Sequence, residues 1–248
     1  MIKLERNFTP IFFSPTNVEK LTLNFKNTGA HVWQHQSVKE ACLEIGNNKC
    51  AFCEVVLNQK STYLEIEHFK DKDSYPDDVI QWENLLPACR HCNGTKSTHD
   101  VVREPIINPS INIPSEHLYF KAYRIKGRTS LGIMTEEVLN LNDSEHYVIE
   151  RCKIGTLISE QIEEAEKKFS NYCSSSIPAR KREVNKIVKA LLNQCQKSAL
   201  FSAVSATILH HGDEYINLRS NMMRTGIWSD QLEELHQSSL CLCLPNSR

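Results

Sequence analysis

Two Cys-x-x-Cys pairs are the residues of this chain best suited to hold a metal ion. Cys50 and Cys53 form the first pair, and Cys89 and Cys92 form the second. Each short turn lets two sulfurs bind the same ion, and four thiolates can hold one tetrahedral zinc at about 2.3 Å. The segment between the pairs is longer than the roughly 15–20 residues of a plain zinc ribbon. We therefore expect the zinc to close a loop that carries other functional residues.

An acidic residue followed by a histidine, Glu67-His68, lies inside that loop. An imidazole with an ordinary pKa near 6.5 can take a proton from water at neutral pH. A hard divalent cation such as Mg²⁺ prefers a few oxygen ligands, and the Glu67 carboxylate and the Asn93 amide oxygen fit that preference. Such a cation neutralises the negative charge that develops when a phosphodiester is cleaved. These residue types thus indicate metal-assisted hydrolysis.

This arrangement resembles the HNH (ββα-metal) endonucleases whose fold is stapled by four cysteines. The resemblance implies that Glu67 is the acidic metal ligand, His68 the general base, and Asn84 the residue that orients the histidine and braces the loop. Asn93 takes the place of the last metal ligand, which makes the motif H-N-N, and Lys96 falls where a basic residue often faces phosphate. The implied cofactors are a structural Zn²⁺ on the four cysteines and a catalytic Mg²⁺ or Mn²⁺. The implied fold is α+β, with a zinc-stapled ββα-metal core and a mostly α-helical C-terminal region.

Each of these residues also has a purely structural interpretation. A histidine in an apolar run is usually a core residue, and an asparagine such as Asn84 can cap a helix or a turn. Two Cys pairs alone most often indicate a zinc ribbon or a nucleic-acid-binding zinc module. A non-catalytic, zinc-stapled adaptor is therefore the alternative function, and the Glu67-His68 pair argues against it because a zinc scaffold does not require that pair. His91, within the second Cys pair, could face a metal or solvent, and His99 has no assigned role.

The composition limits how this chain could find a nucleic acid. Its 248 residues are enough for a core and one or two domains, but the formal net charge is only −1. Strong standalone nucleic-acid binders carry a basic field, so we expect a partner to supply substrate capture. The segment 1–6 lacks the apolar region of a signal peptide, and no run approaches the roughly 18 apolar residues of a membrane span. These features predict a cytoplasmic chain with reduced thiols and no membrane contact.

The order of segments predicts three regions. Residues 1–36 form an N-terminal region rich in phenylalanine, which is either an arm that binds a partner or a segment that packs back on the core. Residues 37–104 form the nuclease core, which opens with a short helix capped by Ser37 and includes an alternating strand over 62–69. Residues 105–248 comprise a linker with several prolines, a small β-hairpin and the helical C-terminal region.

Periodicity and turn signals predict the elements of the last region. The hairpin is expected to pair 118–125 with 129–134 around Lys126-Gly127. Apolar residues recur at helical spacing over 155–173, and a serine-rich stretch ending in Pro178 breaks that helix.

A second helix carries the one basic face of the chain. Its apolar stripe runs from Val184 to Cys195, and its other side carries Arg180, Lys181 and Arg182. This face could touch phosphates, or it is simply a solvated helix face. The next apolar run, 199–211, is expected to end at Gly212.

Short sequence motifs after the second Cys pair narrow the resemblance to a smaller family. An Asn-Pro step, a small strand pair and the run Leu139-Asn-Leu-Asn142 with a downstream arginine are similar to PtuB, the family of HNH subunits of Septu and retron anti-phage defence operons. The likeness runs over roughly residues 45–155. It implies an effector endonuclease that cleaves DNA, tRNA or other RNA and is controlled by a PtuA-like ABC-type ATPase. In the retron versions the partner set includes a reverse transcriptase with its msDNA. A standalone restriction-type nuclease is a further alternative, which the near-neutral charge and the lack of a sequence-reading module disfavour.

Overall fold

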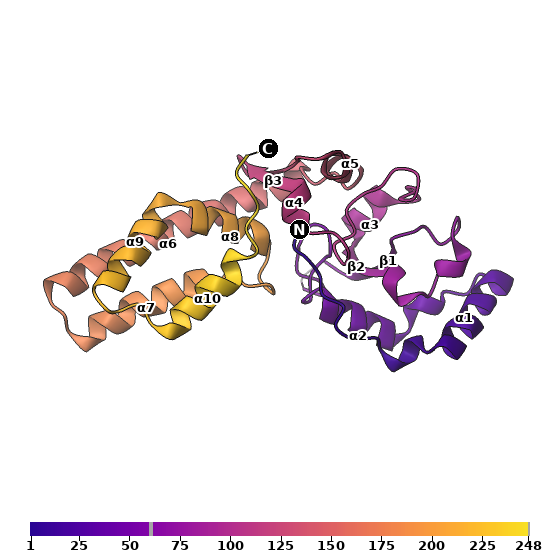
Figure 1. The fold of residues 1–248 in the computed structure, drawn as a ribbon, viewed down its shortest axis with the longest axis horizontal. Coiled ribbons are helices and arrows are strands. Elements are labelled where there is room, and N and C mark those ends of the chain that lie inside the picture. Colours follow the sequence, from indigo (N-terminus) through magenta and orange to yellow (C-terminus); the bar gives the residue numbers. More distant parts are fainter. Residues whose placement is uncertain (60–61, 248) are drawn as a thin grey trace. The chain divides into compact units, whose positions relative to one another are not determined.

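The computed structural model describes residues 1–59 and 62–247, and the chain folds into two compact units (Figure 1). The first unit comprises Met1–Leu118 and Ile125–Leu141, and the second comprises Tyr119–Arg124 and Asn142–Arg248. The described residues are mostly helical and contain two small two-stranded sheets, which confirms the α+β class. Within the described ranges, no helix combines the length and the apolar character that a membrane span requires.

Two helices open the first unit. α1 (Pro15–Thr28) begins at a proline, whose missing N–H is not needed in the first turn, and ends at Gly29, which adopts the left-handed conformation with a φ of 69°. α2 (Gln36–Ile45) begins one residue before Ser37, the predicted cap. That prediction is wrong, because His35 is the N-cap and its Nδ1 accepts a hydrogen bond of 3.2 Å from the backbone N–H of Ser37.

The N-terminal region packs back on the core of the first unit. Short 3-10 turns at Ile11–Phe13 and Val32–Gln34 flank α1. Phe13 and Trp33 are buried in one apolar cluster with Trp82, which lies in the segment between the two Cys pairs. Of the two expectations for this region, the structure therefore supports packing on the chain's own core, and a partner-binding role stays a prediction.

The centre of the first unit is built from two strands and a helix in direct succession. β1 (Leu64–His68) pairs antiparallel with β2 (Leu85–Cys89), and α3 (Arg90–Lys96) starts where β2 ends. β1 confirms the strand predicted over 62–69. Short 3-10 turns at Pro76–Asp78 and Trp82–Asn84 lie in the connection between the strands. This connection, together with the two strands, lies within the segment that the two Cys pairs were expected to close.

The hairpin that follows differs from the prediction. The segment after α3 contains α4 (Pro114–His117), β3 (Leu118–Lys121), β4 (Arg124–Gly127) and α5 (Ser130–Val138). The turn lies at Ala122 and Tyr123, whose φ angles are 48° and 62°, so the prediction of a turn at Lys126-Gly127 is wrong. Residues 129–134 were expected to be a strand, but they open α5. Thr129 caps that helix by accepting the backbone N–H of Gly132 at 3.1 Å.

The second unit is helical, as predicted. Its elements are a π-helical turn (Ser144–Val148), α6 (Ile149–Ser174), α7 (Pro178–Asn193), α8 (Ser202–His211), α9 (Asp213–Arg224) and α10 (Asp230–Leu240). Ile158 and Ile162 of α6 and Val184 and Leu191 of α7 are buried, which confirms the two apolar stripes. Gly212 follows α8 directly, as expected.

Candidate metal-binding and catalytic site

The four cysteines converge at one end of the strand pair. Cys50 and Cys53 lie in a tight turn, Cys89 ends β2, and Cys92 lies in the first turn of α3. All four are buried, and their Sγ atoms lie within 4.8 Å of one another, with 3.6 Å between those of Cys53 and Cys89. A tetrahedral ion with bonds of about 2.3 Å needs sulfurs roughly 3.8 Å apart. The cluster could therefore bind zinc with little movement.

The surroundings favour a thiolate at the start of α3. Hydrogen bonds from the sulfur atoms of Cys50, Cys53 and Cys92 hold the pKa of the Cys89 thiol well below its usual range. The backbone N–H of Cys92 also points to the Cys89 sulfur, at 3.5 Å. Burial raises the pKa of Cys53, and hydrogen bonds with the neighbouring sulfurs raise the pKa of Cys92, so the cluster by itself favours a single thiolate. Zinc ligands must be deprotonated, and zinc binding would displace the remaining protons.

An acidic cleft of about 500 Å³ lies beside β1 and α3 of the same unit. Its lining includes Glu65, Glu67, His68, Asp71 and Asn93. Glu65 and Glu67 are two residues apart on β1, and alternate residues of a strand point to the same face. The cleft thus brings together three of the residues predicted from sequence, and it adds two carboxylates, at positions 65 and 71, that sequence reasoning missed.

Glu67 is buried against a lysine. The residue is 2% exposed, and its Oε1 lies 2.6 Å from the ammonium of Lys96. Burial raises the pKa of Glu67 to about 7, although the Lys96 charge acts in the opposite direction. A further positive charge beside this carboxylate would favour its ionised form. The donor set of the cleft, carboxylates and an amide, is the kind that Mg²⁺ or Mn²⁺ binds.

Lys96 lies inside the unit. It is 1% exposed, and besides Glu67 its ammonium donates a hydrogen bond of 3.0 Å to the backbone carbonyl of His68. Sequence reasoning placed Lys96 where it could face a phosphate. In the structure its charge is directed at the carboxylate, so a direct contact with phosphate stays a prediction.

His68 is held by a backbone carbonyl and an indole ring. Its Nε2 lies 3.0 Å from the carbonyl oxygen of Val79, and its ring meets that of Trp33 edge to face at 4.7 Å. A carbonyl only accepts, so Nε2 carries the hydrogen and Nδ1 keeps its lone pair. Burial lowers the pKa of His68 to about 4, below the ordinary value used in the sequence argument. The imidazole is therefore neutral at pH 7 and has a nitrogen able to accept a proton.

Asn84 fastens both ends of the loop between β1 and β2. Its Oδ1 accepts the backbone N–H of Lys70 at 2.7 Å, and its Nδ2 donates to the carbonyls of Lys70 and Asp78 at 3.1 and 3.0 Å. Val79, whose carbonyl holds His68, follows directly. Asn84 thus contacts the loop backbone directly before the residue whose carbonyl meets His68, and its role in orienting the histidine stays a prediction.

The polar groups of Asn93 and Asp71 face parts of the same cleft. Asn93 Nδ2 donates a hydrogen bond of 2.6 Å to Glu65 Oε2. Asp71 is buried, and its Oδ2 accepts the backbone N–H of Ser74 at 3.0 Å. The alternating pattern of β1 could have indicated Glu65, since it shares a face with Glu67. Nothing in the local sequence marks Asp71, which the loop conformation brings back to the cleft.

The remaining residues predicted from sequence lie elsewhere. Arg180, Lys181 and Arg182 are near the start of α7, in the second unit, where Arg180 donates to the carbonyl of Asn171 at 2.6 Å. His99 Nε2 lies 2.7 Å from the carbonyl oxygen of Glu104.

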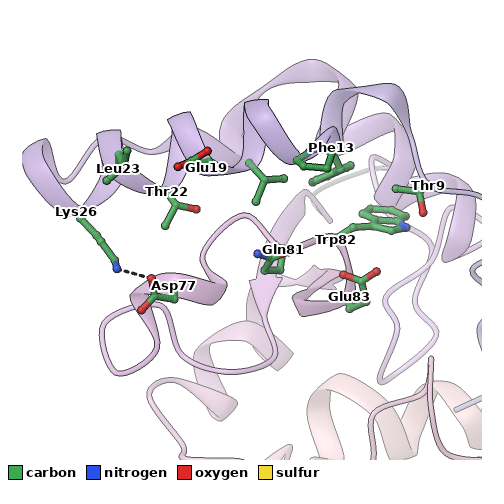
Figure 2. A pocket seen from close by; sticks show the side chains of 12 residues that line it. Thr9, Phe13, Glu19, Thr22, Leu23, Lys26, Asp77, Gln81, Trp82 and Glu83 are labelled. Carbon is green, nitrogen blue, oxygen red and sulfur yellow. Dashed lines mark hydrogen bonds and ion pairs between the residues drawn. The ribbon is translucent and has the colours of Figure 1, made fainter.

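A second cavity, of about 540 Å³, lies between α1 and the segment 77–83 (Figure 2). Thr22 and Trp82 are among its lining residues, and an ion pair between Lys26 and Asp77 crosses it. The ion pair ties α1 to the loop that carries Val79. This cavity contains no candidate catalytic group from the sequence analysis.

Comparisons with known proteins give a consistent family. No family model and no solved structure matches the chain. The chain is 38% identical over 219 residues to the Septu protein PtuB of Bacillus thuringiensis. This alignment covers 87% of this chain and 85% of that protein. It is 30% identical to the Septu protein PtuB of Bacillus mycoides over 49% of this chain and 55% of that protein. The chain therefore belongs to the family of the Septu protein PtuB.

Proposed function

We propose that this chain is a metal-dependent HNH endonuclease that hydrolyses phosphodiester bonds of nucleic acid as the effector of an anti-phage defence system. One observation carries the proposal: Glu67, His68 and Asn93 line a single cleft in the unit that also contains the four-cysteine cluster. A zinc scaffold alone does not require a neutral histidine with an available nitrogen beside a group of oxygen ligands. The family membership supports the Septu assignment.

In this proposal His68 is the general base. Its Nδ1 accepts a proton from a water molecule as the water oxygen attacks phosphorus and the bond to the leaving sugar oxygen breaks. The carbonyl of Val79 holds the Nε2–H, which fixes the tautomer and stabilises the imidazolium that forms. Burial of the ring against Trp33 keeps it neutral beforehand. Asn84 keeps the loop, and therefore the Val79 carbonyl, in place.

Glu67 and Asn93 would hold the divalent cation, Mg²⁺ or Mn²⁺. When bound, that cation supplies positive charge against the charge that develops on the phosphate. Lys96 favours the ionised form of the Glu67 carboxylate and holds it in position, because its ammonium contacts both this carboxylate and the adjacent backbone. The four cysteines would hold a structural Zn²⁺ at the other end of the strand pair.

Substrate capture is assigned to a partner. The cleft is acidic and the formal net charge is −1, so the chain by itself attracts a polyanion weakly. The family resemblance points to a PtuA-like ABC-type ATPase in the cytoplasm, and in retron versions to a reverse transcriptase with msDNA. The start of α7, with Arg180, Lys181 and Arg182, would contact nucleic-acid phosphates. The substrate is DNA, tRNA or another RNA.

The second candidate is a non-catalytic, zinc-stapled adaptor. The ion pair between Glu67 and Lys96 favours it, because a carboxylate already neutralised by a lysine can be purely structural.

A metal titration separates the two candidates. The complex co-purified with its ATPase is stripped with EDTA, and Mg²⁺ or Mn²⁺ is added back while plasmid DNA and tRNA are assayed for strand breaks. The nuclease proposal expects cleavage that returns with the cation while the zinc content stays constant. A complex that binds nucleic acid but leaves it intact at every cation concentration would favour the adaptor.

A further inference from the structure

A hydrogen bond between a carboxylate and an amide joins β1 to α3 in the acidic cleft. Asn93 Nδ2 lies 2.6 Å from Glu65 Oε2. An ionised carboxylate only accepts, and an amide nitrogen only donates. The contact therefore fixes which way the Asn93 amide faces: the nitrogen is directed at Glu65, and Oδ1 is on the other side of the amide group.

The direction of that amide matters for a cation. Hard divalent cations bind amides through oxygen and gain nothing from an NH₂ group. An asparagine side chain that is free to rotate presents either end, whereas a partner that accepts from Nδ2 selects the orientation in which Oδ1 is available. Glu65 is well placed for this role because it shares a strand face with Glu67, the proposed carboxylate ligand.

We propose that Glu65 is a positioning residue, which holds the Asn93 amide so that Oδ1 faces the divalent cation. This inference rests on the cation site of the proposed function, but it does not depend on which reaction that site performs. Groups that orient a metal ligand typically contribute roughly 10–100-fold to metal affinity. Loss of the Glu65 carboxylate is expected to weaken cation binding by a factor in that range.

Two other roles for Glu65 make different predictions. If Glu65 itself binds the cation, its removal weakens binding whether or not Asn93 is present. If Glu65 only ties β1 to α3, its removal lowers the melting temperature and leaves the cation affinity unchanged. If Glu65 orients the Asn93 amide, its removal weakens cation binding only in a chain that still has Asn93.

A double-mutant cycle on Mn²⁺ affinity decides between these roles. The full chain, loaded with zinc and free of nucleic acid, is titrated with Mn²⁺ and followed by electron paramagnetic resonance. Glu65→Ala is expected to weaken binding about 10-fold or more, and Asn93→Ala at least as much. In the Asn93→Ala background, Glu65→Ala is expected to add less than about twofold. Glu83→Ala, an exposed carboxylate outside the cleft, is the matched control and should not change the affinity.

The conservative variant covers the case in which Glu65→Ala does not fold. Glu65→Gln keeps an acceptor oxygen at the same distance along the side chain, and a neutral hydrogen bond is about half as strong as a charge-assisted one. We expect it to retain Mn²⁺ affinity within about fivefold of the wild type. A Glu65→Gln variant that loses binding as completely as Asn93→Ala would show that the carboxylate is itself a ligand.

Besides that outcome for Glu65→Gln, three results would overturn the inference. They are a Glu65→Ala effect that persists undiminished without Asn93, an unchanged Mn²⁺ affinity in Glu65→Ala, and a wild-type chain that binds no Mn²⁺. The test is separate from that of the reaction, because cleavage is not measured. If no cleavage is found but the double-mutant cycle gives the expected coupling, hydrolysis is rejected and the role of Glu65 stands. If cleavage is found but the cycle shows no coupling, the role of Glu65 is rejected and hydrolysis stands.

Discussion

Replacing Lys96 with methionine tests how the first unit tolerates the buried carboxylate of Glu67. Lys96 is 1% exposed, and its ammonium lies 2.6 Å from Glu67 Oε1 and 3.0 Å from the carbonyl oxygen of His68. Methionine keeps most of the apolar stem and removes the charge. Removing one partner of a buried ion pair leaves an uncompensated charge. We expect the free energy of unfolding of the first unit to fall by about 3–5 kcal/mol at pH 8.

The pH dependence of this loss has a definite sign. Burial raises the pKa of Glu67 from 4.5 to about 7, so the folded protein protonates this carboxyl before the unfolded chain does. Its contribution to stability is complete at low pH and is lost as the pH rises from about 4.5 through 7. Without Lys96 the pKa rises further. At pH 5 the Glu67 carboxyl is protonated in both chains, and the variant still lacks the Lys96 contacts to Glu67 and to the His68 carbonyl. Its deficit should therefore shrink by at most about 1.4 kcal/mol between pH 8 and pH 5, since only about one pKa unit of titration separates the two chains in that range.

Urea unfolding of the zinc-loaded chain, followed by tryptophan fluorescence, measures this effect. Trp33 and Trp82 lie in the first unit and Trp228 in the second, so a Trp228→Phe parent reports on the first unit alone. The control is Lys96→Met combined with Glu67→Gln, which removes both charges and should recover much of the loss. A Lys96→Met chain as stable as its parent at pH 8 would refute the reasoning.

Three further changes have expected outcomes. Burial lowers the pKa of His210 to about 3, so on acidification the imidazole is protonated in the unfolded chain before it is protonated in the folded one. The second unit should therefore lose stability as the pH falls from about 6.5 toward 3, by at most about 2 kcal/mol at pH 5. Denaturation followed by circular dichroism measures this loss. Gly155→Ala should lower the stability of the second unit by about 1–3 kcal/mol in the same assay, because its Cβ would lie 2.5 Å from the Tyr123 ring. Cys50→Ser should reduce the zinc content to near zero and unfold the first unit, whereas Cys173→Ser, an exposed cysteine, should keep its zinc; equal zinc in both would contradict the four-cysteine site.

Sequence reasoning located the elements whose signals are local. The strand of Glu67 and His68 was read from its alternation, and the stripes of α6 and α7 from their helical spacing. The hairpin was misplaced because Gly127 resembled a turn residue. Its Cβ would lie 2.2 Å from the backbone nitrogen of Ile133, so the glycine permits close packing against α5, while the turn falls at Ala122 and Tyr123.

Contacts between elements could not be read from the sequence. The carboxylate of Glu65 gains a role only once α3 brings Asn93 within 2.6 Å. The resemblance places Lys96 where a basic residue often faces phosphate, and only the fold shows that its ammonium contacts both Glu67 and the His68 carbonyl. The pKa of His68 depends on burial that follows from the packing of Trp33.

The most direct test of the central claim is the cleavage rate of a His68→Ala variant. The variant is co-expressed and purified with the proposed ATPase partner and compared with the wild-type complex on plasmid DNA and tRNA in the presence of Mg²⁺. His99→Ala, which changes a histidine outside the cleft, is the matched control. We predict that His68→Ala lowers cleavage by a factor on the order of 10²–10⁴ or more, with unchanged zinc content and partner binding. Cleavage by His68→Ala at the wild-type rate would contradict the account.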